Sequence, residues 1–287
     1  LVERSALVTA VLKIVGIAVL AAAGLIGAAA TGAGFFSDGS DSGDGLLGVV
    51  AAVALCVLAY KGFTTITNQG DDLKDAKRNI ARSIMISIAI CAVLYLLITL
   101  SVGASIGASG AIDARDYALA EAAHPLFGAW GVGITVAVAV IATLSGLLAS
   151  LFSVSRLYGM LQDMKQAPAL PARVPHQPLL ITAGAAIVLT AVFDLGRIAA
   201  LGVFLYLTMD IAVQWGVLRR LRDKIIAHRW LPIATIVLDV AILAAFTISK
   251  VQSDLLTVGV AAGLAAVIFA AQAWVVTRRH RTETSGR

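Results

Sequence analysis

The chain has 287 residues, of which 59% are hydrophobic and 14% charged, with a formal net charge of +5 and a mean hydropathy of +0.92. A soluble domain carries roughly 25% charged residues, so this composition excludes an ordinary soluble protein and indicates an integral membrane protein. The basic balance does not indicate nucleic-acid binding, because the positive charges are confined to alternate loops.

Eight apolar segments predict transmembrane helices, each of which needs about 20 residues to cross a bilayer. In chain order we expect them at 6–30, 47–68, 83–105, 128–157, 178–193, 197–218, 230–249 and 255–277. Small and aliphatic residues dominate them, as in packed helices rather than in alternating barrel strands. The predicted fold class is therefore an all-α polytopic membrane protein, with a short amphipathic surface helix at 113–124 and a connector at 166–178.

The basic residues predict the orientation of the chain. The N-terminus, the segments 70–82, 156–176 and 219–229, and the C-terminal tail hold 17 of the 22 Lys and Arg residues. The intervening loops hold only Arg115, Arg197 and Lys250. Because cytoplasmic loops are enriched in Lys and Arg, we expect both termini in the cytoplasm and a location in the cell membrane.

The second predicted span is interrupted at Tyr60-Lys61-Gly62. Irregular backbone in hydrocarbon survives only where it lines a protein-enclosed cavity, and a cation there costs ~2.5–3.5 kcal/mol on insertion scales. Many secondary transporters bind their substrate at such a broken helix. The alternative is a kink in the helix core with Lys61 reaching to one membrane surface.

Three further charged residues fall inside predicted spans. Lys13 lies roughly 10 Å inside the first span, so it is either functional or long enough to reach the interface. Asp210 and Asp239 are each either a functional counter-ion or relay, or structural partners of a nearby hydroxyl or lysine. Cys56 and Cys91 show no metal or redox spacing, and the four histidines lie far apart, so we expect no metal site and no cofactor.

The segment 59–84 resembles the sixth helix and following loop of amino acid permeases of the amino acid–polyamine–organocation (APC) superfamily. That signature runs F-A-Y-x-G-F, then E-x-K-N-P-x-R-N-I-P-x-A-I. The matching residues are Ala59, Tyr60, Gly62, Phe63, Lys74, Arg78, Asn79, Ile80 and Ile84. The departures are Lys61 at the variable position, Asp75-Ala76 in place of Asn-Pro, and Ala81 in place of proline. Taken alone, residues 69–84 are typical of a solvated, mixed-charge cytoplasmic loop.

Three other segments extend the resemblance over the chain. Residues 155–160 are similar to the end of the family's eighth helix, 194–222 to the tenth helix, and 8–24 to the fifth helix with its single lysine. The resemblance implies an inverted five-plus-five-helix repeat (LeuT-like) fold. It assigns 6–30 to the last helix of the first repeat, 47–218 to the second repeat and 230–277 to two accessory helices. We expect the first four family helices to be missing, so that the chain is N-terminally incomplete.

The resemblance implies secondary active transport of an amino acid or related small organic amine, coupled to protons, without enzymatic activity. It places the substrate at Ala59, Tyr60, Lys61, Gly62 and Phe63. It implies that Lys13 takes and releases the coupling proton beside Thr143 and Ser145. Asp210 is a further candidate because it is a carboxylate inside a predicted span, not because of the resemblance. The implied partners are the substrate, protons and the lipid bilayer.

Two alternatives stay open. The chain can be a truncated, transport-incompetent permease fragment, since half of the shared substrate site should come from a missing helix; on this ground we expect no substrate accumulation by the chain alone. It can also be a membrane-embedded enzyme acting on lipids, but such enzymes usually need clustered Asp or His. Here Asp71, Asp72 and Asp75 alternate with cations, which favours a solvated loop.

Overall fold

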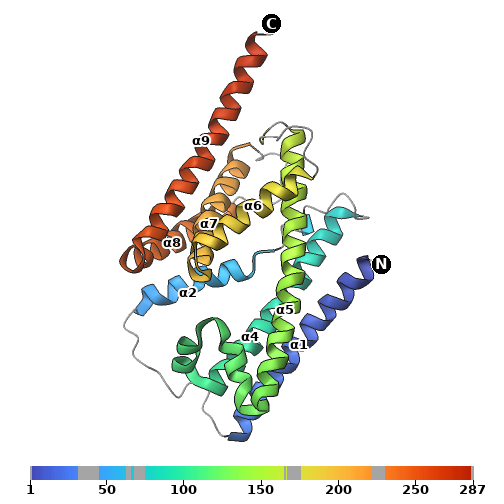
Figure 1. The fold of residues 1–287 in the computed structure, drawn as a ribbon. Helices are drawn as coiled ribbons and strands as arrows, with labels where there is room; N and C mark the ends of the chain where they lie inside the picture. The colour runs from blue at the N-terminus through green and yellow to red at the C-terminus, as the bar shows by residue number, and fades with distance from the viewer. Residues whose placement is uncertain are drawn as a thin grey trace. The chain divides into compact units, whose positions relative to one another are not determined.

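The computed structural model describes residues 2–31, 45–62, 66–67, 75–164, 166, 176–220 and 230–285. Within these ranges the secondary structure is helical, with no strand (Figure 1). The elements are α1 (Val2–Thr31), α2 (Gly45–Ala59), α4 (Ala76–Ala114), the 3-10 helix η2 (Arg115–Tyr117), α5 (Ala118–Asp163), α6 (Gln177–Val192), α7 (Leu195–Arg220), α8 (Trp230–Ser253) and α9 (Leu255–Ser285).

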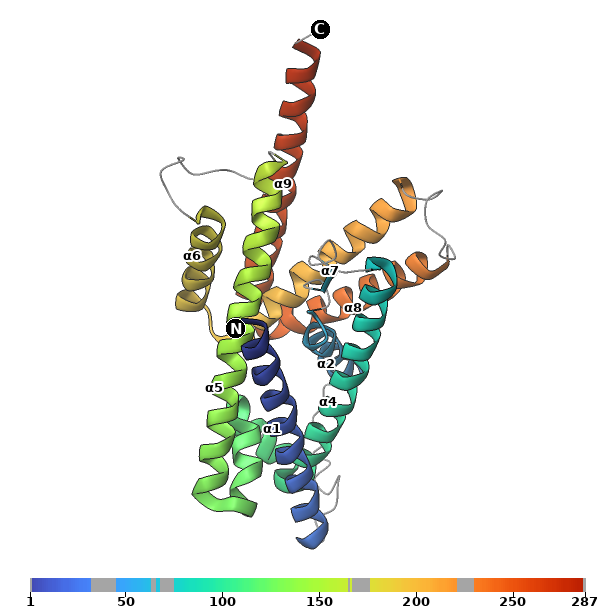
Figure 2. The ribbon, with the colours of Figure 1, turned by 90° about the vertical axis from the view of Figure 1, so that its right-hand side faces the viewer.

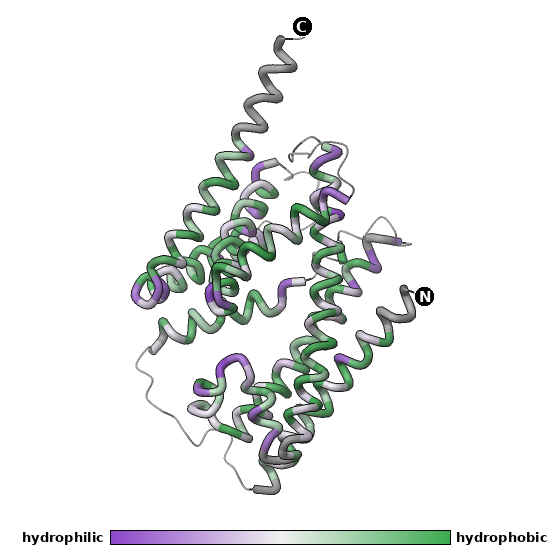
Figure 3. The backbone as a smooth tube through the Cα atoms, viewed as in Figure 1, coloured by the Kyte–Doolittle hydropathy of each residue, from purple (hydrophilic) through white to green (hydrophobic). Residues whose placement is uncertain are grey.

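Every predicted span overlaps one of these helices, so the prediction of an all-α polytopic membrane protein is confirmed. Six helices in the described residues are long and apolar enough to cross a membrane, and two shorter apolar ones cover Leu47–Ala59 and Gln177–Val192. Figure 3 shows apolar residues along the helices and hydrophilic residues concentrated near helix ends. Outward side chains such as Ile26, Leu148 and Ile187 are exposed, which suits helices surrounded by lipid.

Several helices extend beyond the predicted spans. The third span was expected to begin at residue 83, but α4 begins at Ala76, inside the expected loop 70–82. The physical reason is that a helix does not have to end at the membrane surface: polar residues such as Arg78 and Asn79 continue it into water. In contrast, α2 ends at Ala59, before the predicted limit of residue 68.

The chain divides into two compact units. The first comprises residues 1–42 and 62–154 and contains α1, α4 and α5 as far as Val154. In this unit α1 packs along α4 (Figure 2). The helices approach closely at Gly24, where an added Cβ would lie 1.8 Å from the hydroxyl oxygen of Ser101. Small residues at helix contacts are the usual means of close packing in membranes.

Two glycines interrupt the long helices of the first unit. Gly107 in α4 has φ 70° and Gly128 in α5 has φ 56°, and both values lie in the left-handed region that glycine adopts without steric cost. The breaks isolate the short helical stretch 108–127, which includes η2. The surface helix expected at 113–124 falls within this stretch.

The second unit comprises residues 43–61 and 155–287 and is built from α2, α6, α7, α8 and α9. Its core lies where α2, α7, α8 and α9 meet, and its members are Ala54, Ala200, Leu201, Val203, Phe204, Leu207, Ile242, Phe246 and Ala261. The rings of Phe204 and Phe246 pack at a tilt, with centroids 5.0 Å apart. This core holds the second half of α2 and the middles of α7 and α8 in mutual contact.

Aspartates cap two helices at one end of this unit. Asp194 accepts a hydrogen bond from the backbone N–H of Arg197 (2.7 Å) at the start of α7, and Asp254 accepts one from that of Thr257 (3.3 Å) at the start of α9. The Arg197 Nε also donates to Asp254 Oδ2 at 2.8 Å. The Thr257 hydroxyl and the Arg197 guanidinium together hold the pKa of Asp254 below its usual range. The loops before α7 and α9 therefore lie at the same end of the unit.

Candidate functional site

The first candidate feature is the interruption after α2. The helix ends at Ala59, and Tyr60, Lys61 and Gly62 form a turn in which the Lys61 N–H donates to the Leu58 carbonyl at 3.0 Å. The predicted break in the helix is thus confirmed at these residues. Ala59, Lys61 and Gly62 are exposed and Tyr60 is half-buried. Phe63, the remaining residue of the predicted substrate site, lies outside the described residues.

Lys61 contacts an aromatic ring on α7. Its Nζ lies over the face of Tyr206, 4.5 Å from the ring centroid. A cation in this position is attracted by the negative face of the ring, an interaction worth about 0.5–1 kcal/mol where solvent reaches it. This contact brings the helix break next to the middle of α7.

Two carboxyl groups lie close to the same tyrosine. Tyr206 and Asp210 are four residues apart on α7 and therefore share a face of the helix. The carboxyl group of Asp239, on α8, is within hydrogen-bonding reach of that of Asp210. The Tyr206 phenol is near enough to both to interact with their charges.

Asp239 is the more enclosed of the two carboxyls. Its residue is 8% exposed, and its Oδ2 has no hydrogen-bond partner among the described residues. Burying an ionised carboxylate without donors is costly, and on insertion scales a charged Asp at the centre of a span costs about 2.5–3.5 kcal/mol. A cation, an ammonium group or a proton would each lower that cost.

Sequence reasoning had named Asp210 and Asp239 separately and had not placed them together, and it missed Tyr206. One signal was available, namely the spacing of four residues between Tyr206 and Asp210. The contact between α7 and α8 that pairs the two aspartates had no signal in the sequence.

The second candidate feature lies in the first unit. The Lys13 ammonium on α1 donates a hydrogen bond to the Ser145 hydroxyl on α5, with 2.9 Å between Nζ and Oγ. Both residues are half-buried. The two helices also approach each other at Gly16, where an added Cβ would lie 3.0 Å from a methyl group of Val138. The structure therefore brings together Lys13 and Ser145, two of the predicted proton-coupling residues.

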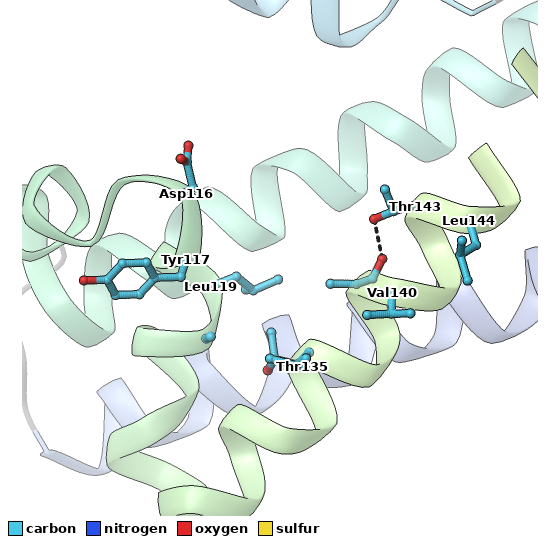
Figure 4. A pocket seen from close by; sticks show the side chains of 10 residues that line it. Asp116, Tyr117, Leu119, Thr135, Val140, Thr143 and Leu144 are labelled. Carbon is cyan, nitrogen blue, oxygen red and sulfur yellow. Dashed lines mark hydrogen bonds between the residues drawn. The ribbon is translucent and has the colours of Figure 1, made fainter. Parts of the chain in front are cut away.

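Thr143 lies elsewhere on α5. Its hydroxyl donates to the carbonyl of Ala139 in the preceding turn, as Figure 4 shows. Two positions separate it from Ser145, which places the side chains on different faces of the helix. Thr143 therefore does not share the position of Ser145 beside Lys13.

Thr143 instead lines a pocket of about 600 Å³. One side of this pocket is formed by η2 and the first residues of α5, and the other side by residues 135–144 of α5. The lining is mainly apolar, with Thr135 and Thr143 as its hydroxyl groups on the long part of α5 and Asp116 and Tyr117 on η2. In Figure 4 the Asp116 carboxylate and the Tyr117 ring point away from Thr135. The Thr135 hydroxyl is also bonded to its own helix, at the Gly131 carbonyl (2.8 Å). The pocket thus presents little polar chemistry to a ligand.

In the described residues, no group of three or more His, Cys, Asp or Glu side chains has the arrangement of a metal site. The charged groups at the two features are Lys13, bonded to a serine, and Lys61, over a tyrosine whose phenol lies near two aspartates.

Comparison with known proteins gives the family. No curated protein matches the chain. The family model described as "Amino acid permease" matches residues 3–260, which is most of the chain and includes both candidate features. This is a family of membrane transporters for amino acids, in agreement with the apolar helices and the broken second span. The chain belongs to the amino acid permease family.

Proposed function

We propose that the chain carries out proton-coupled transport of an amino acid or related small organic amine across the cell membrane. The observation that carries this proposal is the charged turn after α2, where Lys61 lies over the ring of Tyr206. The phenol of the same tyrosine lies near the carboxyl groups of Asp210 and Asp239. Family membership supports the substrate class.

The substrate is bound at residues 59–63 in this proposal. An amino acid carries a carboxylate and an ammonium group, and the turn offers a partner for each. The Lys61 ammonium attracts the carboxylate, and the carboxyl groups of α7 and α8 attract the amine. Binding at a helix interruption is a recurrent solution in secondary transporters.

Lys13 is the proton-coupling group in this proposal. Its hydrogen bond to Ser145 links α1 to α5, and it breaks or reorganises when the lysine loses its proton, because a neutral amine is a weaker donor. Protonation of Lys13 then biases the two arrangements of α1 and α5 that alternating access requires. Asp210 is a secondary candidate for the same role.

Both termini are cytoplasmic in this proposal, on the 17-to-3 distribution of basic residues between the two sets of loops. The Arg197–Asp254 pair supports the prediction that successive loops lie on alternate sides of the membrane. It joins two loops that the distribution of basic residues assigns to the same, outer side.

Uptake of radiolabelled amino acids into proteoliposomes tests the proposal. The measurement is made on the 287-residue chain and on the chain with any in-frame sequence that its gene encodes upstream. We expect at least one of the two products to accumulate an amino acid against its gradient when the outside is acidic, and to lose this accumulation with a protonophore. If neither product takes up any amino acid under a proton gradient, the proposal is wrong.

A further inference from the structure

Asp210 and Asp239 lie at matching depths on adjacent helices. Asp210 is about 15 Å along the axis from Arg220, the end of α7, and Asp239 is about 14 Å from Trp230, the start of α8. α7 and α8 follow one another in the chain and pack together, so these ends lie on the same side of the pair of helices (Figure 2). Both carboxyls are consequently far from either end of their helices.

The chemistry of two adjacent carboxyl groups limits their protonation. An ionised carboxylate only accepts hydrogen bonds, so a hydrogen bond between two carboxyls requires that one of them holds a proton. Two negative charges side by side in an apolar setting also repel strongly. The burial of Asp239 and the absence of a described partner for its Oδ2 act in the same direction, because no donor compensates a full charge there.

We propose that Asp210 and Asp239 form a proton-binding site in which the two carboxyl groups share one proton. Among the described residues, the titratable groups that face the pair are Tyr206 on α7, whose phenol lies near both carboxyls, and the two aspartates themselves. Lys61, after α2, contacts the ring face of the same tyrosine. The span of α9 that packs on α7 and α8, Leu255–Ala273, carries no charged residue. One shared proton therefore leaves a single negative charge on the pair.

Release of that proton would add a second negative charge next to Tyr206, the residue whose ring face Lys61 contacts. This site differs from the Lys13–Ser145 pair, which lies in the other unit, and its existence does not depend on the transport proposal.

Infrared difference spectroscopy of the purified chain in detergent tests the site. A protonated carboxylic acid has a C=O stretching band that shifts in D2O, whereas a carboxylate has none in that region. We expect the parent protein to show such a band at neutral pH and to lose it as the pH is raised. Mass spectrometry after treatment with a hydrophobic carbodiimide, which attacks protonated carboxyls in apolar surroundings, should locate the label on Asp210 or Asp239. This labelling needs no variant.

Two substitutions separate a shared proton from a proton on one carboxyl. Asp210→Asn and Asp239→Asn each replace one carboxyl by an amide that donates a hydrogen bond to the other, so the remaining carboxylate no longer needs a proton. We expect both variants to lose the band at neutral pH. Asp254→Asn, at the ion-paired carboxylate before α9, is the control and should keep it.

Three results would overturn the proposal. The first is a parent without the band and without label at either aspartate at neutral pH. The second is a band that survives in either single variant, which would show that one carboxyl holds its own proton. The third is a parent without the band whose thermal stability rises with Na⁺ or K⁺, which would assign the pair to a metal cation. The proposed transport can fail while the band persists, so the two proposals are separable.

Discussion

The Nζ of Lys13 lies 2.9 Å from the Oγ of Ser145, although 132 positions separate the two residues in the chain. This hydrogen bond connects α1 to α5 and gives the ammonium of Lys13 a neutral acceptor.

The stability of this contact is the first prediction. Ser145→Ala removes the acceptor and should lower the free energy of unfolding by about 1 kcal/mol, the value of an ordinary hydrogen bond rather than of one to a buried charge, because both residues are only half-buried. Thr143→Ala is the matched control on the same helix: its hydroxyl bonds its own backbone, so little should change. The measurement is denaturant unfolding in detergent micelles. Equal effects of the two substitutions would contradict the assignment.

The role of Lys13 in coupling is the second prediction. In a transport-competent protein, Lys13→Ala and Lys13→Arg should both abolish proton-driven accumulation, because alanine carries no proton and arginine does not release its own. Exchange of labelled for unlabelled substrate should survive in at least one of them. If Lys13→Arg accumulates substrate like the parent, the lysine only anchors its helix.

The third prediction concerns the Lys61–Tyr206 contact. A double-mutant cycle with Lys61→Met and Tyr206→Leu should give a coupling energy of about 0.5–1 kcal/mol, as for cation–π pairs at accessible sites. Tyr206→Phe keeps the ring and should keep most of this coupling, and Lys61→Arg should also retain it. A coupling energy of zero in the first cycle would mean that the ammonium does not occupy the ring face in the protein.

The fourth prediction concerns the close approach of α1 and α4. Gly24→Val should destabilise the protein by about 1–3 kcal/mol, because even a Cβ at this position would overlap the buried Ser101 hydroxyl. Gly259→Ala is the control in α9, where an added Cβ meets nothing within 4 Å. It should be neutral or stabilising by up to about 1 kcal/mol, since alanine favours a helix. A Gly24→Val variant that melts like the parent would exclude this helix contact.

The fifth prediction is a pH dependence at Asp254. Its pKa is lowered by Thr257 and Arg197, so its contribution to stability is present above the unfolded value of about 3.9 and is lost as the pH falls through the folded value. Asp254→Asn keeps a capping side chain but removes the ion pair. The parent should therefore melt above this variant at about pH 7 and at about pH 5, and the difference should shrink below about pH 4. A difference that is unchanged at the acid end would show that the ion pair is not its source.

The sequence by itself determined the helices and the family. Apolar runs of membrane length predict eight spans because the hydrocarbon thickness sets how many residues a helix needs. The interruption at Lys61 and Gly62 was also readable, because a cation and a glycine in the middle of an apolar run are costly unless the backbone changes there. The start of α4 at Ala76 could not be predicted from the sequence. Polar residues can continue a helix beyond the membrane, and the hydropathy pattern does not show where such an extension begins.

The tertiary structure alone decided which charged side chains meet. Asp210 and Asp239 stand out in their spans, yet nothing in either segment indicates that they face each other or that Tyr206 lies between them and Lys61. The resemblance to permeases named Lys13, Thr143 and Ser145 together, and the structure separates Thr143 from the other two. The physical reason is common to these cases. A membrane helix is apolar on every side, so its hydropathy sets its length and depth, whereas its rotation and its neighbours follow from side-chain packing and from hydrogen bonds between segments far apart in the chain.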